Sequence, residues 1–158
     1  TYGRMGETTC SDCEAGKYAS LGADSCELCG SGTYSSVRAA SCSTCIAGKV
    51  SSPGAEECTP CDAGFYAAAG SSGCSMCTPG KHSSDGAGHC PACEAGKYSS
   101  TGAATCSVCQ AGKYSELVSA TEGASTCTDC DAGKFSSAGS SSCAGSCKPG
   151  TYGGPGSS

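Results

Sequence analysis

The sequence is poor in the large apolar side chains that build a globular core. Trp is absent and Phe occurs twice, while Leu, Ile and Val occur only at Leu21, Leu28, Val37, Ile46, Val50, Val108, Leu117 and Val118. Chains with less than about 20% Leu, Ile, Val and Phe cannot bury enough surface to offset roughly 1–2 kcal/mol of backbone entropy per residue. We therefore expect covalent cross-links to supply the missing stability.

The sequence also lacks Asn, long apolar runs and clustered cations. Without Asn there is no acceptor for N-linked glycans. The formal net charge of −5 argues against a nucleic-acid partner, because phosphate binding requires clustered Lys and Arg. The chain contains no signal peptide, transmembrane run or lipidation motif, so we expect a mature or trimmed segment without direct membrane insertion.

Signatures of catalysis and cofactor binding are missing as well. The sequence has no phosphate loop and no recognisable nucleophile–base pattern. Glu56, Glu57, Asp129 and Asp131 are acidic, but no D-x-D-x-D-G loop of the calcium-binding type surrounds them. We expect neither an enzyme nor a cofactor.

Cysteine, in contrast, is abundant. It accounts for 18 of the 158 residues, above the roughly 8–10% that is typical of disulfide scaffolds. Such density indicates an oxidising compartment, so we expect a secreted protein that is extracellular or at the cell surface.

The cysteines come in pairs that repeat every 16 residues. The first Cys of each pair is Cys10, Cys26, Cys42, Cys58, Cys74, Cys90, Cys106, Cys127 and Cys143. The second is Cys13, Cys29, Cys45, Cys61, Cys77, Cys93, Cys109, Cys130 and, at a wider spacing, Cys147. We predict one tandem array over 1–158, with a partial repeat at 1–9 and repeats that start at 10, 26, 42, 58, 74, 90, 106, 127 and 143.

Other positions repeat with the cysteines and give the consensus C-x-x-C-x-x-G-K-Y-S-S-x-G-x-x-x. The first Gly suits a positive-φ turn, K-Y-S-S has strand character with Tyr on one face, and the second Gly reverses the chain. Val50 and His82 replace the aromatic residue, and Arg38 replaces the second Gly. Stacked copies would cover each other's Tyr and cystine. The predicted fold class is a small disulfide-rich protein, an elongated solenoid of 16-residue modules with short β-hairpins and almost no helix.

One repeat is longer than the others. The segment between Cys109 and Cys127 carries five extra residues, best placed at 116–120. Glu116, Leu117 and Val118 are a candidate contact loop for a neighbouring molecule. The alternative is a tolerated loop whose apolar side chains fold back on the array, and the sequence leaves both open.

Translational symmetry favours one disulfide pairing, in which the second Cys of each pair bonds the first Cys of the next and closes the hairpin between them. The predicted bonds are Cys13–Cys26, Cys29–Cys42, Cys45–Cys58, Cys61–Cys74, Cys77–Cys90, Cys93–Cys106, Cys109–Cys127 and Cys130–Cys143. Cys10 and Cys147 are then left for flanking repeats or for a bond between chains. The rival pairing, within each C-x-x-C, has the geometry of a redox motif, which is implausible here without a thioredoxin-like context.

The motif C-x-x-G-K-Y-S-S-x-G-x-x-x-C-x-x-C resembles the ephrin-receptor-like cysteine-rich repeat. It is also similar to the first small module of the cysteine-rich domains of tumour-necrosis-factor receptors. The resemblance covers nearly the whole chain and implies hairpin modules, each closed by one disulfide, in an elongated extracellular array. The receptor families continue with a further ladder of disulfides, which this chain lacks. This departure favours a rod over a ligand receptor.

Metal binding is the main competing interpretation. Successive C-x-x-C pairs approach the spacing of zinc ribbons, but nine pairs cannot divide into closed four-Cys sites. His82 and His89 share one repeat and suggest a metal or pH site, yet His82 also fits as a substitute for the packing Tyr and His89 as a surface residue. The Lys residues after the first Gly form a predicted row that shields strand edges; they are Lys17, Lys49, Lys81, Lys97, Lys113 and Lys134.

The expected function is structural. We expect a rod-like extracellular stalk, or a subunit of a surface filament assembled head to tail, such as a flagellar hair or fibril of a protist. The alternative is an ectodomain that binds a protein or glycan ligand. Partners are then further copies of the chain or other surface proteins, and Ser51, Ser52, Thr59 and Thr78 are candidate acceptors of O-linked glycans in a glycoprotein. Residues 1–3 and 151–153 both match the middle of a repeat, which suggests a trimmed array or ends that meet other chains.

Overall fold

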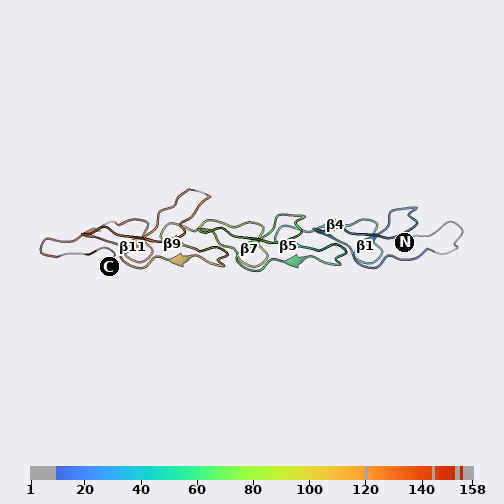
Figure 1. Ribbon diagram of the computed structural model, residues 1–158, viewed down its shortest axis with the longest axis horizontal. Helices are drawn as coiled ribbons and strands as arrows, with labels where there is room; N and C mark the ends of the chain where they lie inside the picture. The colour runs from blue at the N-terminus through green and yellow to red at the C-terminus, as the bar shows by residue number, and fades with distance from the viewer. Residues whose placement is uncertain (1–9, 120, 144, 152–153, 155–158) are drawn as a thin grey trace. The chain divides into compact units, whose positions relative to one another are not determined.

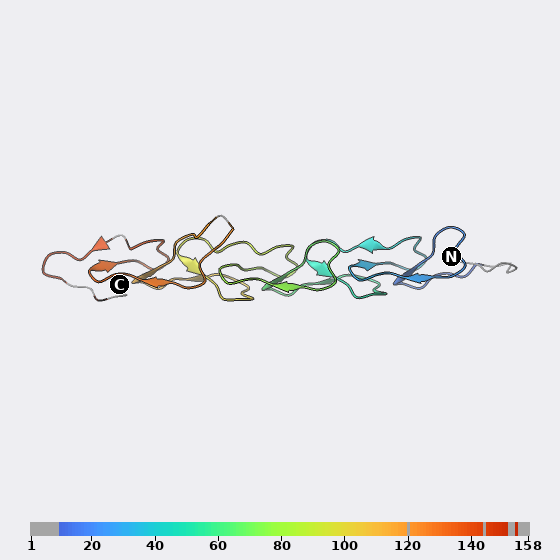
Figure 2. The same cartoon turned by 45° about the horizontal axis from the view of Figure 1, so that its top comes forward.

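The computed structural model of the protein describes residues 10–119, 121–143, 145–151 and 154. Within these residues there is no helix, and so none that could span a membrane. Regular structure consists of two-residue strands separated by turns (Figures 1 and 2). The strands are β1 (Lys17–Tyr18), β2 (Glu27–Leu28), β3 (Thr33–Tyr34), β4 (Ser43–Thr44), β5 (Lys49–Val50), β6 (Thr59–Pro60), β7 (Phe65–Tyr66), β8 (Ser75–Met76), β9 (Lys97–Tyr98), β10 (Ser107–Val108), β11 (Lys113–Tyr114), β12 (Thr128–Asp129), β13 (Lys134–Phe135) and β14 (Gly145–Ser146).

These strands form seven two-stranded hairpins, β1–β2, β3–β4, β5–β6, β7–β8, β9–β10, β11–β12 and β13–β14. In each, the segment after the first Gly pairs with the two residues inside the next C-x-x-C. The β1–β2 hairpin sets the register, with Lys17 opposite Leu28 and Tyr18 opposite Glu27 in antiparallel orientation. The predicted class of small disulfide-rich tandem modules with short hairpins and almost no helix is confirmed.

The hairpin that contains His82 is reduced to a single antiparallel bridge, Lys81 opposite Ala92. Its next residue pair is His82 and Pro91, joined by a bond from the His82 N–H to the Pro91 carbonyl at 3.1 Å. Pro91 has no N–H to return that bond, so the strand pairing cannot extend.

Eight disulfides close the hairpins, and they join the same pairs that translational symmetry favours. Seven span 13 residues, whereas Cys109–Cys127 spans 18 because of the insertion. Loops of this size contribute roughly 3 kcal/mol each in the chain-entropy account of cross-linking. Among the described cysteines, Cys10 and Cys147 carry no disulfide.

The chain forms two compact units. Unit 1 comprises Thr1–Asp62, Tyr66–Ser75 and Asp85–His89, and unit 2 comprises Ala63–Phe65, Met76–Ser84 and Cys90–Ser158. The same contacts between modules recur inside each unit, so the two are built on one plan.

Neighbouring modules are joined by backbone hydrogen bonds. In unit 1 the Gly16 N–H donates to the Ser35 carbonyl at 2.8 Å, and a parallel bridge pairs Tyr18 with Ala39. In unit 2 the Gly80 N–H donates to Ser99 at 2.9 Å. Each module is therefore joined to the preceding one by main-chain hydrogen bonds, which do not depend on particular side chains.

Contacts also reach the module after next. The first Gly of one module lies against the second Gly two modules later, as Gly48 does against Gly86 in unit 1 and Gly64 against Gly102 in unit 2. A Cβ built on Gly64 would lie 2.7 Å from the Gly102 carbonyl carbon, a separation that real Cβ atoms do not show. The first Gly is thus required by close backbone approach as well as by its positive φ.

The interior contains cystine sulfur and serine hydroxyls instead of aliphatic side chains. The second Cys of each pair from Cys13 to Cys130 is at most 1% exposed. Beside these cystines lie Ser35, Ser51, Ser83, Ser99, Ser115 and Ser136, all 5% exposed or less. Each of these hydroxyls donates to a carbonyl of the preceding module at 2.8–3.0 Å, as Ser99 does to Lys81.

The expected packing of Tyr against the neighbouring module is only partly met. Tyr18, Tyr34, Tyr66, Tyr98 and Tyr114 are half-buried, and it is the residue after each Tyr that enters the interior. A small side chain fits there because the cystine and the next backbone leave little space. Two modules place Ala at this position, Ala19 and Ala67.

Candidate functional site

Shallow depressions recur on the hairpin surface. One of about 220 Å³ is lined by Tyr34, Thr44, Ile46, Lys49, Glu57 and Cys58. Its counterpart in unit 2, about 300 Å³, is lined by the equivalent Tyr98, Val108, Gln110, Lys113, Thr126 and Cys127. The two depressions thus follow from the repeat, with a Tyr, a Lys and a cystine cysteine in the wall of each.

Ion pairs neutralise most of the predicted Lys row. Lys17 contacts Glu14 at 2.9 Å, Lys97 contacts Glu94 at 2.8 Å, Lys113 contacts Asp129 at 2.7 Å and Lys134 contacts Asp131 at 3.3 Å. The hydrogen bond and charge of Lys17 lower the pKa of Glu14, and those of Lys97 lower the pKa of Glu94. These lysines are therefore poorly placed to form a basic docking surface.

The acidic residues do not converge on a cation site. Asp129 and Asp131 are each bound to a Lys, and Glu56 and Glu57 are exposed. Glu27 accepts a hydrogen bond from the Tyr18 hydroxyl at 2.7 Å, which together with the Glu27 charge raises the pKa of Tyr18. Asp129, Asp131 and Glu27 thus pair locally within their own hairpins.

Only one group of potential metal ligands lies close together among the described residues. His82, Cys93 and Cys106 bring their ligand atoms within 4.8 Å of one another. Cys93 and Cys106, however, form a disulfide with each other, and a cystine offers no thiolate to a metal. The zinc interpretation fails more widely for the same reason, since sixteen cysteines are held in disulfides.

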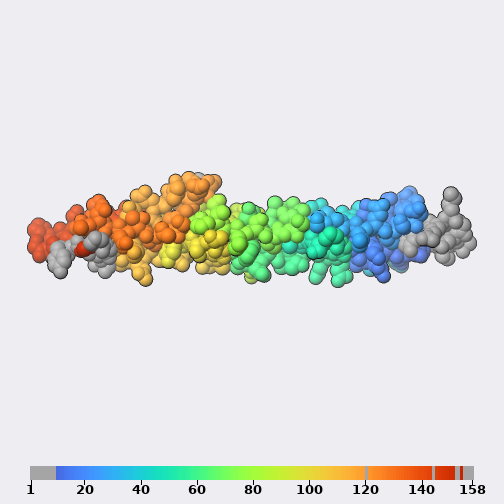
Figure 3. Space-filling model, viewed as in Figure 1, coloured from blue at the N-terminus to red at the C-terminus, as the bar shows by residue number. Residues whose placement is uncertain are grey.

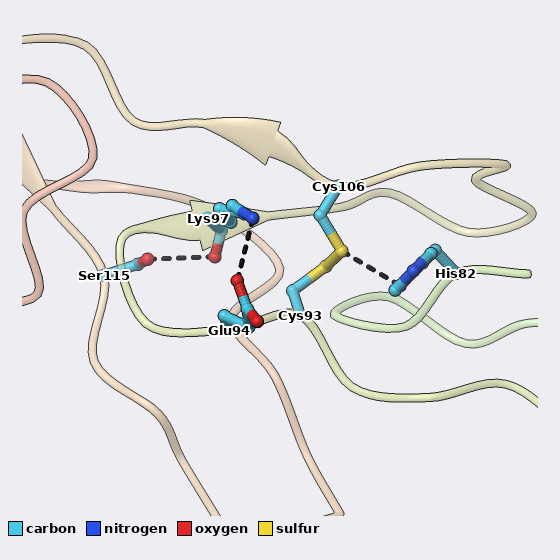
Figure 4. A network of polar contacts seen from close by, with 6 residues as sticks. All are labelled: His82, Cys93, Glu94, Lys97, Cys106 and Ser115. Atoms are coloured by element: carbon cyan, nitrogen blue, oxygen red, sulfur yellow. Dashed lines mark hydrogen bonds and ion pairs between the residues drawn. A yellow bond between two sulfur atoms is a disulfide. The ribbon is translucent and has the colours of Figure 1, made fainter.

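The two histidines differ in their surroundings. His82 is half-buried, and its Nδ1 atom lies 3.1 Å from Sγ of Cys106 (Figure 4). His89 is exposed. The two imidazoles thus do not make a common site, and His82 is the one in contact with a reactive group.

The insertion projects from unit 2 as the orange loop of Figures 1 and 3. Glu116 is exposed, Leu117 and Val118 are 49% and 65% exposed, and Ser119 pairs with Glu122 at the end of the loop. The apolar side chains therefore do not fold into the interior, which is the arrangement a contact loop requires.

The remaining candidates are surface positions. Cys10 is exposed and Cys147 is half-buried. Ser52, Thr59 and Thr78 are exposed, and they stay candidate glycan acceptors. Ser51 is 5% exposed and donates to the Thr33 carbonyl at 2.9 Å, so a glycan could be attached there only before folding.

Sequence reasoning missed the buried serines and the contact of His82 with sulfur. A signal for the serines exists, since Ser or Ala follows the aromatic position, or its Val50 and His82 substitutes, in all eight modules from Tyr18 to Phe135. Nothing in the sequence reveals that residue 82 lies beside the cystine of the following module, because this depends on how the modules stack.

One comparison with known families is informative. No curated protein sequence matches the chain. Residues 96–135, which include β9 to β13, match the family model described as tyrosine-protein kinase ephrin type A/B receptor-like. This segment is similar to the ephrin-receptor-like cysteine-rich module, and tandem disulfide-rich repeats of this kind are typical of extracellular domains.

Proposed function

We propose that the chain is an extracellular structural protein, a rod-like stalk or a subunit of a surface filament. The observation that carries this proposal is the interlocking of modules. Each module contacts the next through backbone hydrogen bonds and the one after it through the Gly–Gly approach, as Gly48 and Gly86 illustrate. A load on such an array is shared among modules instead of falling on one hairpin.

Covalent bonds support the same role. A disulfide closes the loop of each hairpin, as Cys45–Cys58 and Cys93–Cys106 do over 13 residues, so local unfolding and proteolysis are resisted without a large core. These properties suit a spacer outside the cell. The proposal assigns no enzymatic activity and no nucleic-acid partner.

The repeat supports a proposal of head-to-tail assembly. The contacts between modules are heterologous, with different surfaces on the two sides, and such contacts add copies in one direction to build a fibre. In this form of the proposal, Cys147 of one copy bonds Cys10 of the next.

Small-angle scattering and electron microscopy of the disulfide-bonded protein test the rod. A matched variant without residues 42–73 removes two modules and still allows Cys29 to pair with Cys74 at the normal spacing. The proposal expects the maximum dimension to fall in proportion to the modules removed. An unchanged or globular particle would refute it.

The same material separates filaments from isolated rods. If Cys147–Cys10 bonds hold the fibres together, disulfide-linked oligomers should appear on non-reducing gels of the unaltered protein. These oligomers should be absent from the Cys10→Ser variant, which should form no stable fibres. Single particles at all protein concentrations would exclude self-assembly, and the proposal would then be restricted to a rod-like stalk.

A second candidate is a ligand-binding ectodomain, and the exposed Leu117 and Val118 favour it. Their replacement by Ser would abolish binding to a surface partner and leave the particle dimensions unchanged. A change in the particle dimensions of this variant would instead show that the loop stabilises the stacking of the modules.

A further inference from the structure

The Cys93–Cys106 disulfide differs from the other seven by a neighbouring base. His82 is part of the preceding hairpin, and the stacking of modules brings its Nδ1 atom to 3.1 Å from Sγ of Cys106 (Figure 4). In the sequence, the residues equivalent to His82 in the other repeats are Tyr2, Tyr18, Tyr34, Val50, Tyr66, Tyr98, Tyr114, Phe135 and Tyr152. None of these side chains has a nitrogen that could carry a proton to sulfur.

The contact is a property of the position and not of an accidental rotamer. Residue 34 and Cys58 line one depression, and residue 98 and Cys127 line its counterpart. The residue at this place in a module therefore faces the later cysteine of the disulfide that closes the following hairpin. His82 meets Cys106 for that reason.

We propose that Cys93–Cys106 is a thiol-exchange site, the disulfide of this array that low-molecular-weight thiols open first. Two thiols, RSH, transfer two electrons to the disulfide and leave as RSSR, while the Sγ–Sγ bond breaks. One of their two protons stays on Cys93 as a thiol, and the other is held by His82. The Cys106 thiolate then faces an imidazolium, and the charges balance.

Physical chemistry favours the opened form at this site alone. A thiolate that accepts a hydrogen bond from an imidazolium is stabilised over a free thiol, and a stabilised reduced form makes a disulfide more oxidising. Lys97 chiefly lowers the pKa of Glu94, and the charge of His82 lowers this pKa to a smaller degree.

Access to the site is adequate. Cys106 is half-buried, whereas Cys93 is 1% exposed, so an incoming thiolate would attack Cys106. Opening releases the loop between the two cysteines, whose residue Ser99 bonds Lys81 of the preceding module. The opened site is therefore a place where the array can be loosened, or joined to another thiol through a mixed disulfide.

The experiment equilibrates the disulfide-bonded protein with glutathione buffers of graded reducing strength, traps free thiols by alkylation and quantifies each cystine by mass spectrometry. The matched cystine is Cys61–Cys74, whose facing residue is Val50. The equilibrium constant for reduction of Cys93–Cys106 should be about tenfold larger, the lower end of the effect of a hydrogen bond to a charged group.

Two variants make the test independent of folding defects. His82→Tyr restores the consensus residue and should bring Cys93–Cys106 back to the value of Cys61–Cys74. Tyr34→His should make Cys45–Cys58 about tenfold more reducible, since residue 34 faces Cys58. Equal constants for Cys93–Cys106 and Cys61–Cys74, no effect of His82→Tyr, or simultaneous opening of all eight disulfides would overturn the proposal.

Discussion

Gly64 and Gly86 represent the two glycine positions of a module. Both have a positive φ, but they differ in how much space surrounds the Cα atom. Gly64, a first glycine, has φ of 84°, and Gly86, a second glycine, has φ of 67°. A Cβ on Gly64 would run into the backbone of Gly102, whereas on Gly86 its nearest neighbour would be Pro60 Cβ at 4.0 Å. Gly64 is closed by backbone packing, whereas Gly86 is restricted only by its φ.

The sequence contains a natural test of this difference. Arg38 occupies the second position with φ of 64° and pairs with Asp12 at 2.7 Å, so a long side chain is accepted there. Every first position in the array is Gly. A glycine that recurs in a repeat can therefore be required for two separate physical reasons, its positive φ and the close approach of another backbone.

The largest expected effect is that of Gly64→Ala. The methyl group would force the module away from Gly102 and break the Gly64 N–H bond to Ser83 at 2.8 Å. We expect a loss of about 3 kcal/mol or more, typical of backbone strain combined with lost packing. Amide hydrogen exchange and urea unfolding with intact disulfides would measure it.

The matched control is Gly86→Ala, which carries the φ penalty of about 1 kcal/mol without the collision. If the two variants lost equal stability, the close approach of the glycines would not matter, and the comparison would be wrong.

The next effect concerns the buried hydroxyls. Ser99→Ala removes the bond from Ser99 Oγ to the Lys81 carbonyl, 2.8 Å long, and should cost about 1 kcal/mol. Ala67 occupies the same place, 3% exposed, in another module. Ala67→Ser should therefore gain a similar free energy of unfolding. A loss of stability in that variant would contradict the stabilising role of the buried serine hydroxyls.

Much of this fold could be predicted from the sequence because the repeat exposes it. Most copies carry the same spacing, so a short hairpin and its closing disulfide follow from the repeat, as Cys29–Cys42 shows. The register, in which Tyr34 lies opposite Ser43 inside the next C-x-x-C, is not among the predictions. The positive φ expected at the first Gly is found, for example 86° at Gly48.

The offset between stacked modules could not be predicted. Since all modules are alike, a contact with the next module or with the one after fits the pattern equally well. The Gly48–Gly86 approach, the buried Ser99 and the sulfur contact of His82 all depend on that offset. The sequence predicts that stacked modules cover each other's Tyr, whereas the Tyr side chains are half-buried and the small residue after each of them is buried.

A smaller effect is expected at Arg38. Arg38→Gly removes a left-handed non-glycine conformation but loses an exposed ion pair with Asp12, a pair worth about 0–1 kcal/mol. Arg38→Ala loses the ion pair and keeps the conformational penalty. We expect Arg38→Gly to be more stable than Arg38→Ala by about 1 kcal/mol in urea unfolding. Equal stabilities would show that φ is not limiting at the second position.

The smallest effect is electrostatic. Lys97 lowers the pKa of Glu94, so the pair stabilises the fold above the ordinary carboxyl pKa and this contribution disappears as pH falls through the lowered value. Lys97→Ala should raise the pKa of Glu94 in an NMR titration of the carboxyl group. Lys113→Ala, which breaks a pair with Asp129, is the control and should leave Glu94 unchanged.

The most direct test of the account is disulfide mapping by mass spectrometry on native protein digested without reduction. The account predicts cross-linked peptides for Cys13–Cys26, Cys29–Cys42 and their six periodic equivalents. Bonds within the C-x-x-C pairs, or free thiols with bound zinc, would contradict both the stacked hairpins and the extracellular structural role.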